Sequence, residues 1–115
     1  MSRVYYNKLV RDGIPEKISE NGDECETRVI KDELEFKQEL LKKVAEEANE
    51  LSRTGSRQEF LKEYTDLMIV LDALTKLEDI SEAEVQISMK ENLLRKGGFD
   101  NRLFLYWSSD STYKQ

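Results

Sequence analysis

The stretch that decides the fold is residues 42–74, KKVAEEANELSRTGSRQEFLKEYTDLMIVLDAL. It carries two acidic pairs, Glu47 with Glu50 and Glu63 with Asp66, and each pair is spaced i, i+3. In a helix this spacing places both side chains on one face. Between the pairs, the segment RTGS interrupts the apolar periodicity and supplies a glycine and a capping serine. The stretch therefore predicts two helices joined as an antiparallel hairpin.

The acidic side chains fall beside apolar positions of the two predicted helices. Projected at about 100° per residue, Glu47 lies next to Leu40 at the edge of the first apolar arc. On the second helix Glu63 falls between Leu74 and Val70. We therefore expect these carboxylates to face apolar neighbours rather than open water.

Four carboxylates gathered by a hairpin repel one another by about 4 kcal/mol per close pair at an effective dielectric constant near 20. Protonation of one or two of them would relieve this repulsion. A hard divalent cation, Mg²⁺ or Mn²⁺, suits four oxygen ligands on rigid helices better. The alternative is a solvated acidic face, because 37% of the residues are charged.

The acidic residues also carry a resemblance. Glu46-Glu47-x-x-Glu50, twelve further residues and Glu63-x-x-Asp66 resemble the signature of the all-α nucleoside triphosphate pyrophosphohydrolases, the MazG-like enzymes. Residues 6–15, YNKLVRDGIP, and residues 96–99, KGGF, resemble a MazG-like, phosphoribosyl-ATP-pyrophosphohydrolase-like subgroup. The three blocks in this order are far more specific than the acidic motif alone.

The resemblance implies roles for residues beyond the four expected metal ligands. Glu46 would polarise the attacking water or hold a second ion. Lys8 and Arg11, close together in an acidic chain, suggest contact with a phosphate or an acidic partner, although they also suit a solvated face beside packed apolar neighbours. Asn92 and Lys96 would reach the metal-bound phosphates, although Lys96 equally suits the cap of a helix that Gly97 ends.

Composition narrows the possible partners. The chain has 115 residues, which predicts a single domain spanning 1–115. A net charge of −6 argues against a nucleic-acid polymer or an anionic membrane as partner. There is no histidine, so catalysis by the usual Ser-His or Cys-His pairs is excluded. Cys25 is the single cysteine, and we expect a cytoplasmic protein.

The remaining segments complete an all-α prediction with a minor β element. We expect a short helix near residues 15–19, long helices over 33–53 and 57–78, and a third long helix after Ser81. Three capping boxes are expected, formed by Asp32 with Glu35, Ser56 with Glu59 and Ser81 with Glu84. Residues 24–30 and 102–107 are predicted to pair as a two-stranded ribbon. The chain from about residue 108 is expected to be flexible.

The apolar run 67–71, LMIVL, predicts a helix that is buried on all sides. A chain of this length offers few helices to surround it, so we expect a homodimer or homotetramer that completes the MazG-like bundle. The predicted function is Mg²⁺-dependent hydrolysis of a nucleotide to monophosphate and pyrophosphate. The alternatives are a phosphoribosyl-ATP pyrophosphohydrolase and a non-catalytic helical interaction module.

Overall fold

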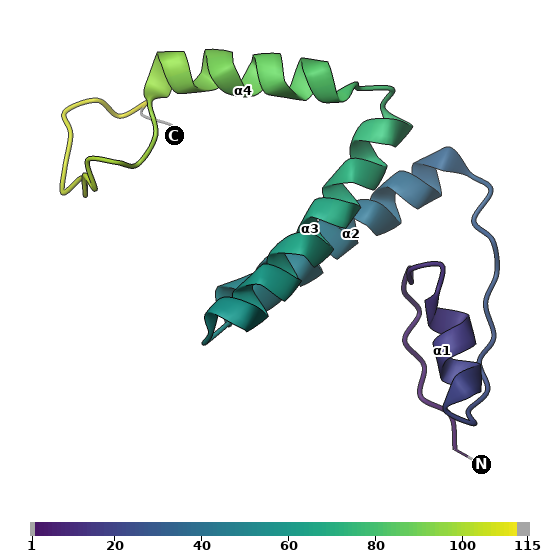
Figure 1. Cartoon of the computed structure of the whole chain (residues 1–115). Coiled ribbons are helices and arrows are strands. Elements are labelled where there is room, and N and C mark those ends of the chain that lie inside the picture. The colour runs from purple at the N-terminus through teal and green to yellow at the C-terminus, as the bar shows by residue number, and fades with distance from the viewer. Residues whose placement is uncertain (1, 113–115) are drawn as a thin grey trace. The chain divides into compact units, whose positions relative to one another are not determined.

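The computed structural model describes residues 2–112 and contains four helices and no strand within them. The helices are α1 (Ile14–Glu20), α2 (Glu33–Ser52), α3 (Arg57–Leu77) and α4 (Glu82–Lys96) (Figure 1). Each predicted helix is therefore present, with bounds within a few residues of those expected. The all-α fold class is confirmed.

The described chain divides into two compact units, Met1–Ile80 and Ser81–Gln115. The first contains α1, α2 and α3, and the second contains α4 and the C-terminal segment. In the first unit α2 and α3 pack side by side and antiparallel, as the hairpin prediction requires (Figure 1). This hairpin positions the acidic residues.

The turn between α2 and α3 is held by its own side chains. Thr54 Oγ1 donates a hydrogen bond to the carbonyl of Leu51, which occupies one of the free carbonyls at the end of α2. Ser56 Oγ accepts from the backbone N–H of Glu59, as an N-cap should. The Glu59 carboxylate accepts from the N–H of Gly55 rather than from that of Ser56. The predicted capping box is therefore correct for the serine cap and wrong for the reciprocal bond to the Ser56 backbone.

The two other predicted capping boxes have different outcomes. Ser81 and Glu84 form both reciprocal bonds at the start of α4, which confirms that prediction. Asp32 caps α2 by accepting from the N–H of Leu34. Glu35 does not return to the Asp32 backbone, because it pairs with Arg28 instead. The capping-box prediction at Asp32 is therefore wrong for its second half.

The core of the hairpin is small. Leu40 on α2 and Val70 on α3 are the buried hydrophobic residues of the described chain, with 4% and 7% of their surfaces exposed. Met68 and Ile69, from the run expected to be buried on all sides, keep 47% and 43% exposed. One face of α3 packs on α2, and the other apolar faces of that run are uncovered within the described residues.

The predicted two-stranded ribbon is not formed in the described chain. Residues 24–30 and 102–107 have neither strand nor ladder hydrogen bonds. Arg102 has a φ of 54°, and its N–H donates to the carbonyl of Phe99. The chain therefore makes a tight turn where the second strand was expected to begin, and this left-handed backbone is incompatible with an extended strand.

The second unit begins with α4 and ends in irregular structure. Gly97 follows the last residue of α4 with φ 75° and ψ −177°, a conformation essentially restricted to glycine. Beyond it, Phe104 and Tyr106 meet edge to face at 5.4 Å between ring centroids. From residue 108, predicted to be flexible, the described part forms a local turn in which Asp110 accepts from Thr112. Residues 113–115 lie outside the described chain.

No helix within residues 2–112 is long and apolar enough to cross a bilayer.

The packing of α2 on α3 yields a stability prediction. Leu40→Ala removes the most buried side chain of the hairpin and should lower the free energy of unfolding by about 2–3 kcal/mol. Leu34→Ala, on the same helix at a position 63% exposed, is the matched control and should change it by less than about 0.5 kcal/mol. Urea unfolding followed by circular dichroism measures both, and equal losses would contradict this assignment of the core.

Candidate functional site

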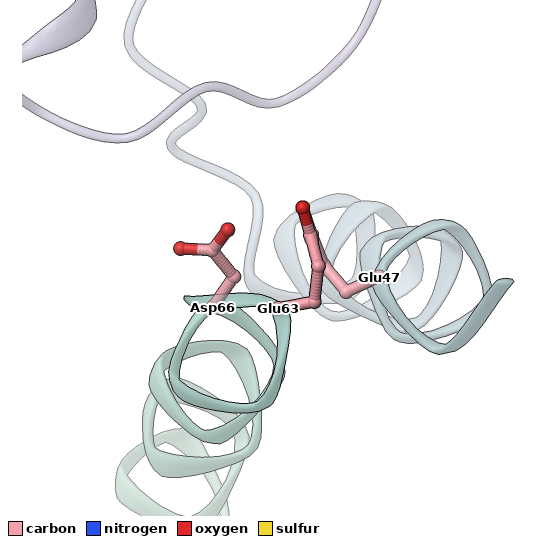
Figure 2. A group of neighbouring side chains, drawn as sticks. All are labelled: Glu47, Glu63 and Asp66. Atoms are coloured by element: carbon pink, nitrogen blue, oxygen red, sulfur yellow. The ribbon is translucent and has the colours of Figure 1, made fainter. Parts of the chain in front are cut away.

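Three carboxylates meet where α2 and α3 face one another. Glu47 comes from α2, and Glu63 and Asp66 come from successive turns of α3. Each residue contributes one carboxylate oxygen, and these three oxygens all lie within 4.8 Å of one another. Figure 2 shows the three side chains directed to the same side of the hairpin. We call this group the acidic cluster.

The acidic cluster is partly shielded from solvent. Only 18% of the Glu63 side chain and 23% of the Asp66 side chain are exposed. The acidic cluster therefore departs from a fully solvated acidic face. Partial burial strengthens the interactions of charges with one another, because less water screens them.

Glu46 and Glu50 lie outside the acidic cluster. Glu50, predicted as a fourth metal ligand, is exposed and is not part of the group of converging oxygens. Glu46, predicted to polarise water, accepts hydrogen bonds or ion pairs from Lys8 at 2.8 Å and from Lys43 at 3.3 Å. The hairpin thus brings together three of the four predicted ligands, while Glu46 is bound to cationic groups.

Two cations pair with Asp66. Arg11 Nη1 lies 3.2 Å from Asp66 Oδ1, and Lys62 Nζ lies 3.2 Å from Asp66 Oδ2. Lys62 Nζ also lies 3.3 Å from Glu63 Oε1. Lysine and arginine side chains therefore supply counter-charge to carboxylates for which the sequence predicted protonation or a metal ion.

Lys43 and Lys62 were missed at the level of sequence, although a signal for both was present. Lys62 precedes Asp66 by four residues and Lys43 precedes Glu46 by three, which places each pair on one helix face. Lys8 and Arg11 were identified as functional candidates for phosphate binding. In the structure both lie beside the acidic residues, and both are paired with carboxylates.

Asn92 and Lys96, the other predicted phosphate contacts, are exposed residues of α4. They belong to the second unit, whereas the acidic cluster belongs to the first. Lys96 is the last residue of α4, where a cation interacts favourably with the C-terminal end of the helix dipole. Their role toward a phosphate stays a prediction.

Electrostatics separates the neighbouring acids Glu46 and Glu47. Burial, assisted by the negative charge of Asp66, raises the pKa of Glu47 above its ordinary value. The hydrogen bond from Lys8 lowers the pKa of Glu46, with a further contribution from Lys43. The same contact with Glu46 raises the pKa of Lys8. The ionised form is thus disfavoured at Glu47 and favoured at Glu46.

The donor set suits a hard divalent cation. Mg²⁺ binds oxygen at about 2.1 Å in an octahedron, so its ligand oxygens are about 3 Å apart at adjacent corners and about 4.2 Å apart at opposite ones. One oxygen from each residue of the acidic cluster lies within 4.8 Å of the other two, which is near these separations. Three protein oxygens would leave the other positions to water or phosphate oxygens.

The opposite pKa shifts predict opposite stability changes for adjacent substitutions. The pKa of Glu47 is higher in the folded protein than in the unfolded one, so the ionised side chain lowers the free energy of unfolding at any pH above its unfolded-state pKa. In metal-free protein at pH 7, Glu47→Gln should therefore raise the melting temperature. Glu46→Gln should lower the melting temperature, since its depressed pKa means that ionised Glu46 contributes stability above the unfolded-state pKa.

Acidification should remove both differences. Glu47→Gln should converge on the wild type as the pH falls to about 4 and below, where the carboxyl group is protonated in both states. Glu46→Gln should converge at lower pH, as the pH passes through the depressed folded-state pKa. Melting curves between pH 3 and 8 in the presence of EDTA measure this, and shifts of the same sign at pH 7 would contradict the electrostatic assignment.

Comparison of the chain with known protein families, with characterised proteins and with solved structures finds no match.

Proposed function

We propose that this chain is a metal-dependent hydrolase that converts a nucleoside triphosphate, or a related nucleotide, to the monophosphate and pyrophosphate. The observation that carries the proposal is the convergence of Glu47, Glu63 and Asp66 within 4.8 Å, with the cations Lys8 and Arg11 beside them. Carboxylates and cations at one place suit a ligand that brings both metal ions and phosphate groups. The resemblance of the acidic motif to the MazG-like enzymes gives the same reaction.

The proposed ligands of Mg²⁺ or Mn²⁺ are the acidic cluster together with Glu50. Glu50 follows Glu47 by one helical turn, so it borders the cluster from the next turn of α2. A bound Mg²⁺ supplies charge neutralisation of phosphate oxygens and acidification of a coordinated water. The four carboxylates would hold the ion, and its charge would offset the repulsion between a phosphate chain and a protein with net charge −6.

Glu46 is the proposed base that orients or deprotonates the attacking water. A glutamate side chain is ionised at neutral pH, so Glu46 can accept a hydrogen bond from water. The hydrogen bond from Lys8 lowers the pKa of Glu46, so the departure of Lys8 would make Glu46 a stronger base. Lys8 has to leave Glu46 before the carboxylate can serve in this way, and Lys8 is then available for a phosphate oxygen. Arg11, Asn92 and Lys96 are the other proposed phosphate contacts.

Two alternatives keep the same helices. A phosphoribosyl-ATP pyrophosphohydrolase would use the same metal chemistry on a different nucleotide. A non-catalytic helical interaction module would use Lys62 and Arg11 as permanent partners of Asp66, which is compatible with the ion pairs in the structure. Metal-dependent release of pyrophosphate would distinguish either enzyme from the interaction module.

We also propose a cytoplasmic location, in keeping with the exposed, unpaired Cys25.

The products test the reaction. With Mg²⁺ and a panel of ordinary and modified nucleoside triphosphates, we expect monophosphate and pyrophosphate as first products. In ¹⁸O-labelled water the label should enter the monophosphate, because the resemblance implies attack at the α-phosphorus. Phosphorus-31 NMR and mass spectrometry identify the products.

Asp66→Asn and Glu78→Gln provide the matched pair of variants for this test. Asp66→Asn should reduce turnover by at least about 100-fold, since a cluster ligand loses its charge. Glu78→Gln removes an α3-end carboxylate that pairs with Lys37, away from the acidic cluster, and should leave turnover unchanged. Diphosphate and orthophosphate as first products would overturn the mechanism, and no turnover of any nucleotide would favour the interaction module.

The exposed apolar residues of α3 support a homodimer or homotetramer. Beyond the run at 67–71, α3 exposes Phe60, Leu61 and Tyr64. Phe60 and Tyr64 stack with ring centroids 6.0 Å apart and keep 49% and 44% of their surfaces exposed. Phe60, Tyr64 and Met68 are spaced four residues apart and therefore share one face of α3, and an exposed apolar stripe of this kind is typical of an interaction site. We propose that a second copy covers it and completes a MazG-like bundle.

Charge placed on this surface tests the assembly. Light scattering at micromolar concentration should report a dimer or larger species for the wild type. Met68→Glu should dissociate it, because Met68 lies on the same helix face as Phe60 and Tyr64, and a carboxylate buried at an apolar contact is unpaired. Gln58→Glu, on the exposed first turn of α3 and outside this face, is the control for added negative charge and should leave the mass unchanged. A wild-type monomer would remove the assembly from the proposal.

A further inference from the structure

The N-terminal arm, residues 2–13, contacts the acidic face of the hairpin through two cationic side chains. Lys8 Nζ lies 2.8 Å from Glu46 Oε1, and Arg11 Nη1 lies 3.2 Å from Asp66 Oδ1. The arm has no helix or strand of its own, and Val4, Tyr5 and Tyr6 are at least 70% exposed. Apart from Leu9 and Val10, which are half-buried, little apolar contact holds it. Ion pairs are therefore a large part of its attachment.

The acidic face is electrically balanced without any metal ion. Four carboxylates lie there, and four cations pair with them or lie close to them. The carboxylates are Glu46, Glu47, Glu63 and Asp66, and the cations are Lys8, Arg11, Lys43 and Lys62. A divalent cation added to this balanced group gives it a surplus of positive charge, which repels the cations already present.

The four cations differ in how easily they can leave. Lys43 and Lys62 belong to α2 and α3 themselves, so the helices keep them within a few ångströms of the carboxylates. Lys8 and Arg11 belong to the arm, which is separated from α2 by α1 and an irregular segment. They can move away together without disturbing the hairpin.

Asp66 is the point where the arm and a metal ion compete. Arg11 occupies one of its oxygens and Lys62 occupies the other. An ion held by Asp66 needs one oxygen free of a cation, and its charge weakens the remaining pair. Glu46, which lies on α2, loses Lys8 when the arm moves.

We propose that residues 2–13 are an internal counter-ion arm, which neutralises the acidic face in the metal-free protein and is released when a divalent cation binds. This inference rests on the proposed function for the identity of the ion's ligands. Release sets an order of events: the metal binds first, and Lys8 and Arg11 then become free for an anionic ligand such as a triphosphate. The arm thereby keeps phosphate from being bound in the absence of metal.

Calorimetric titration of the full chain with Mg²⁺, at low ionic strength and without nucleotide, tests the competition. Arg11→Gln should bind Mg²⁺ about two- to fivefold more tightly than the wild type, the range expected for loss of an exposed ion pair. Arg11→Lys keeps the charge and should match the wild type. Arg28→Gln, which breaks the Arg28–Glu35 pair away from the cluster, is the control and should also match it.

Trypsin cleavage tests the release itself. Lys8 cannot enter the protease pocket while it pairs with Glu46, so Mg²⁺ should accelerate cleavage after Lys8 by at least about threefold. Cleavage after Arg28 in the same sample is the internal reference and should not respond to Mg²⁺. Glu46→Gln should give fast cleavage after Lys8 with or without the ion.

The outcomes distinguish this proposal from the proposed function. If Mg²⁺ binds and Asp66→Asn abolishes binding, but Arg11→Gln matches or weakens wild-type affinity and cleavage after Lys8 ignores Mg²⁺, the arm is not released and only this inference is overturned. If neither the wild type nor Arg11→Gln binds Mg²⁺, both proposals fail. Tighter binding by Arg11→Gln together with Mg²⁺-accelerated cleavage supports the exchange.

Discussion

Repulsion between like charges is the constraint on which this molecule depends. The α2–α3 hairpin packs Glu47 against Glu63 and Asp66 in surroundings that are only partly open to water, and this raises the pKa of Glu47. A hairpin with two well-buried apolar residues has little stability to offset such repulsion. The lysines of α2 and α3 and the two cations of the N-terminal arm are therefore part of what allows the hairpin to form.

The fold was largely predictable because its signals are local. Ser56 and Ser81 cap helices where the sequence places them, and the break before Arg57 joins α2 to α3. The two-stranded ribbon was not predicted correctly for the described residues. A strand needs a partner strand, and the β-favouring composition of residues 102–107 does not reveal the turn in which the N–H of Arg102 donates to the carbonyl of Phe99.

The candidate site was predictable to the extent that helical spacing decides it. The spacing i, i+3 placed Glu63 and Asp66 together, and the hairpin brought Glu47 to them. Glu50 has the same spacing from Glu47, yet it is exposed, because the rotation of α2 about its own axis depends on packing with α3. The pairing of Lys8 and Arg11 with carboxylates was not predictable, because the paired residues are 38 and 55 positions apart in the sequence. Local spacing carries no information about such distant contacts.

The short turn between α2 and α3 has a consequence for how this protein can vary. Its side chains fix where α2 stops and α3 starts, through Thr54 on one side and Ser56 with Glu59 on the other. An insertion in this turn would leave both helices intact, but it would break the side-chain bonds that hold the first turn of α3 beside the last turn of α2. If α3 then slid along α2 by one residue, about 1.5 Å, Glu63 and Asp66 would move by the same distance relative to Glu47. The length of this turn therefore sets how the carboxylates of the two helices are aligned.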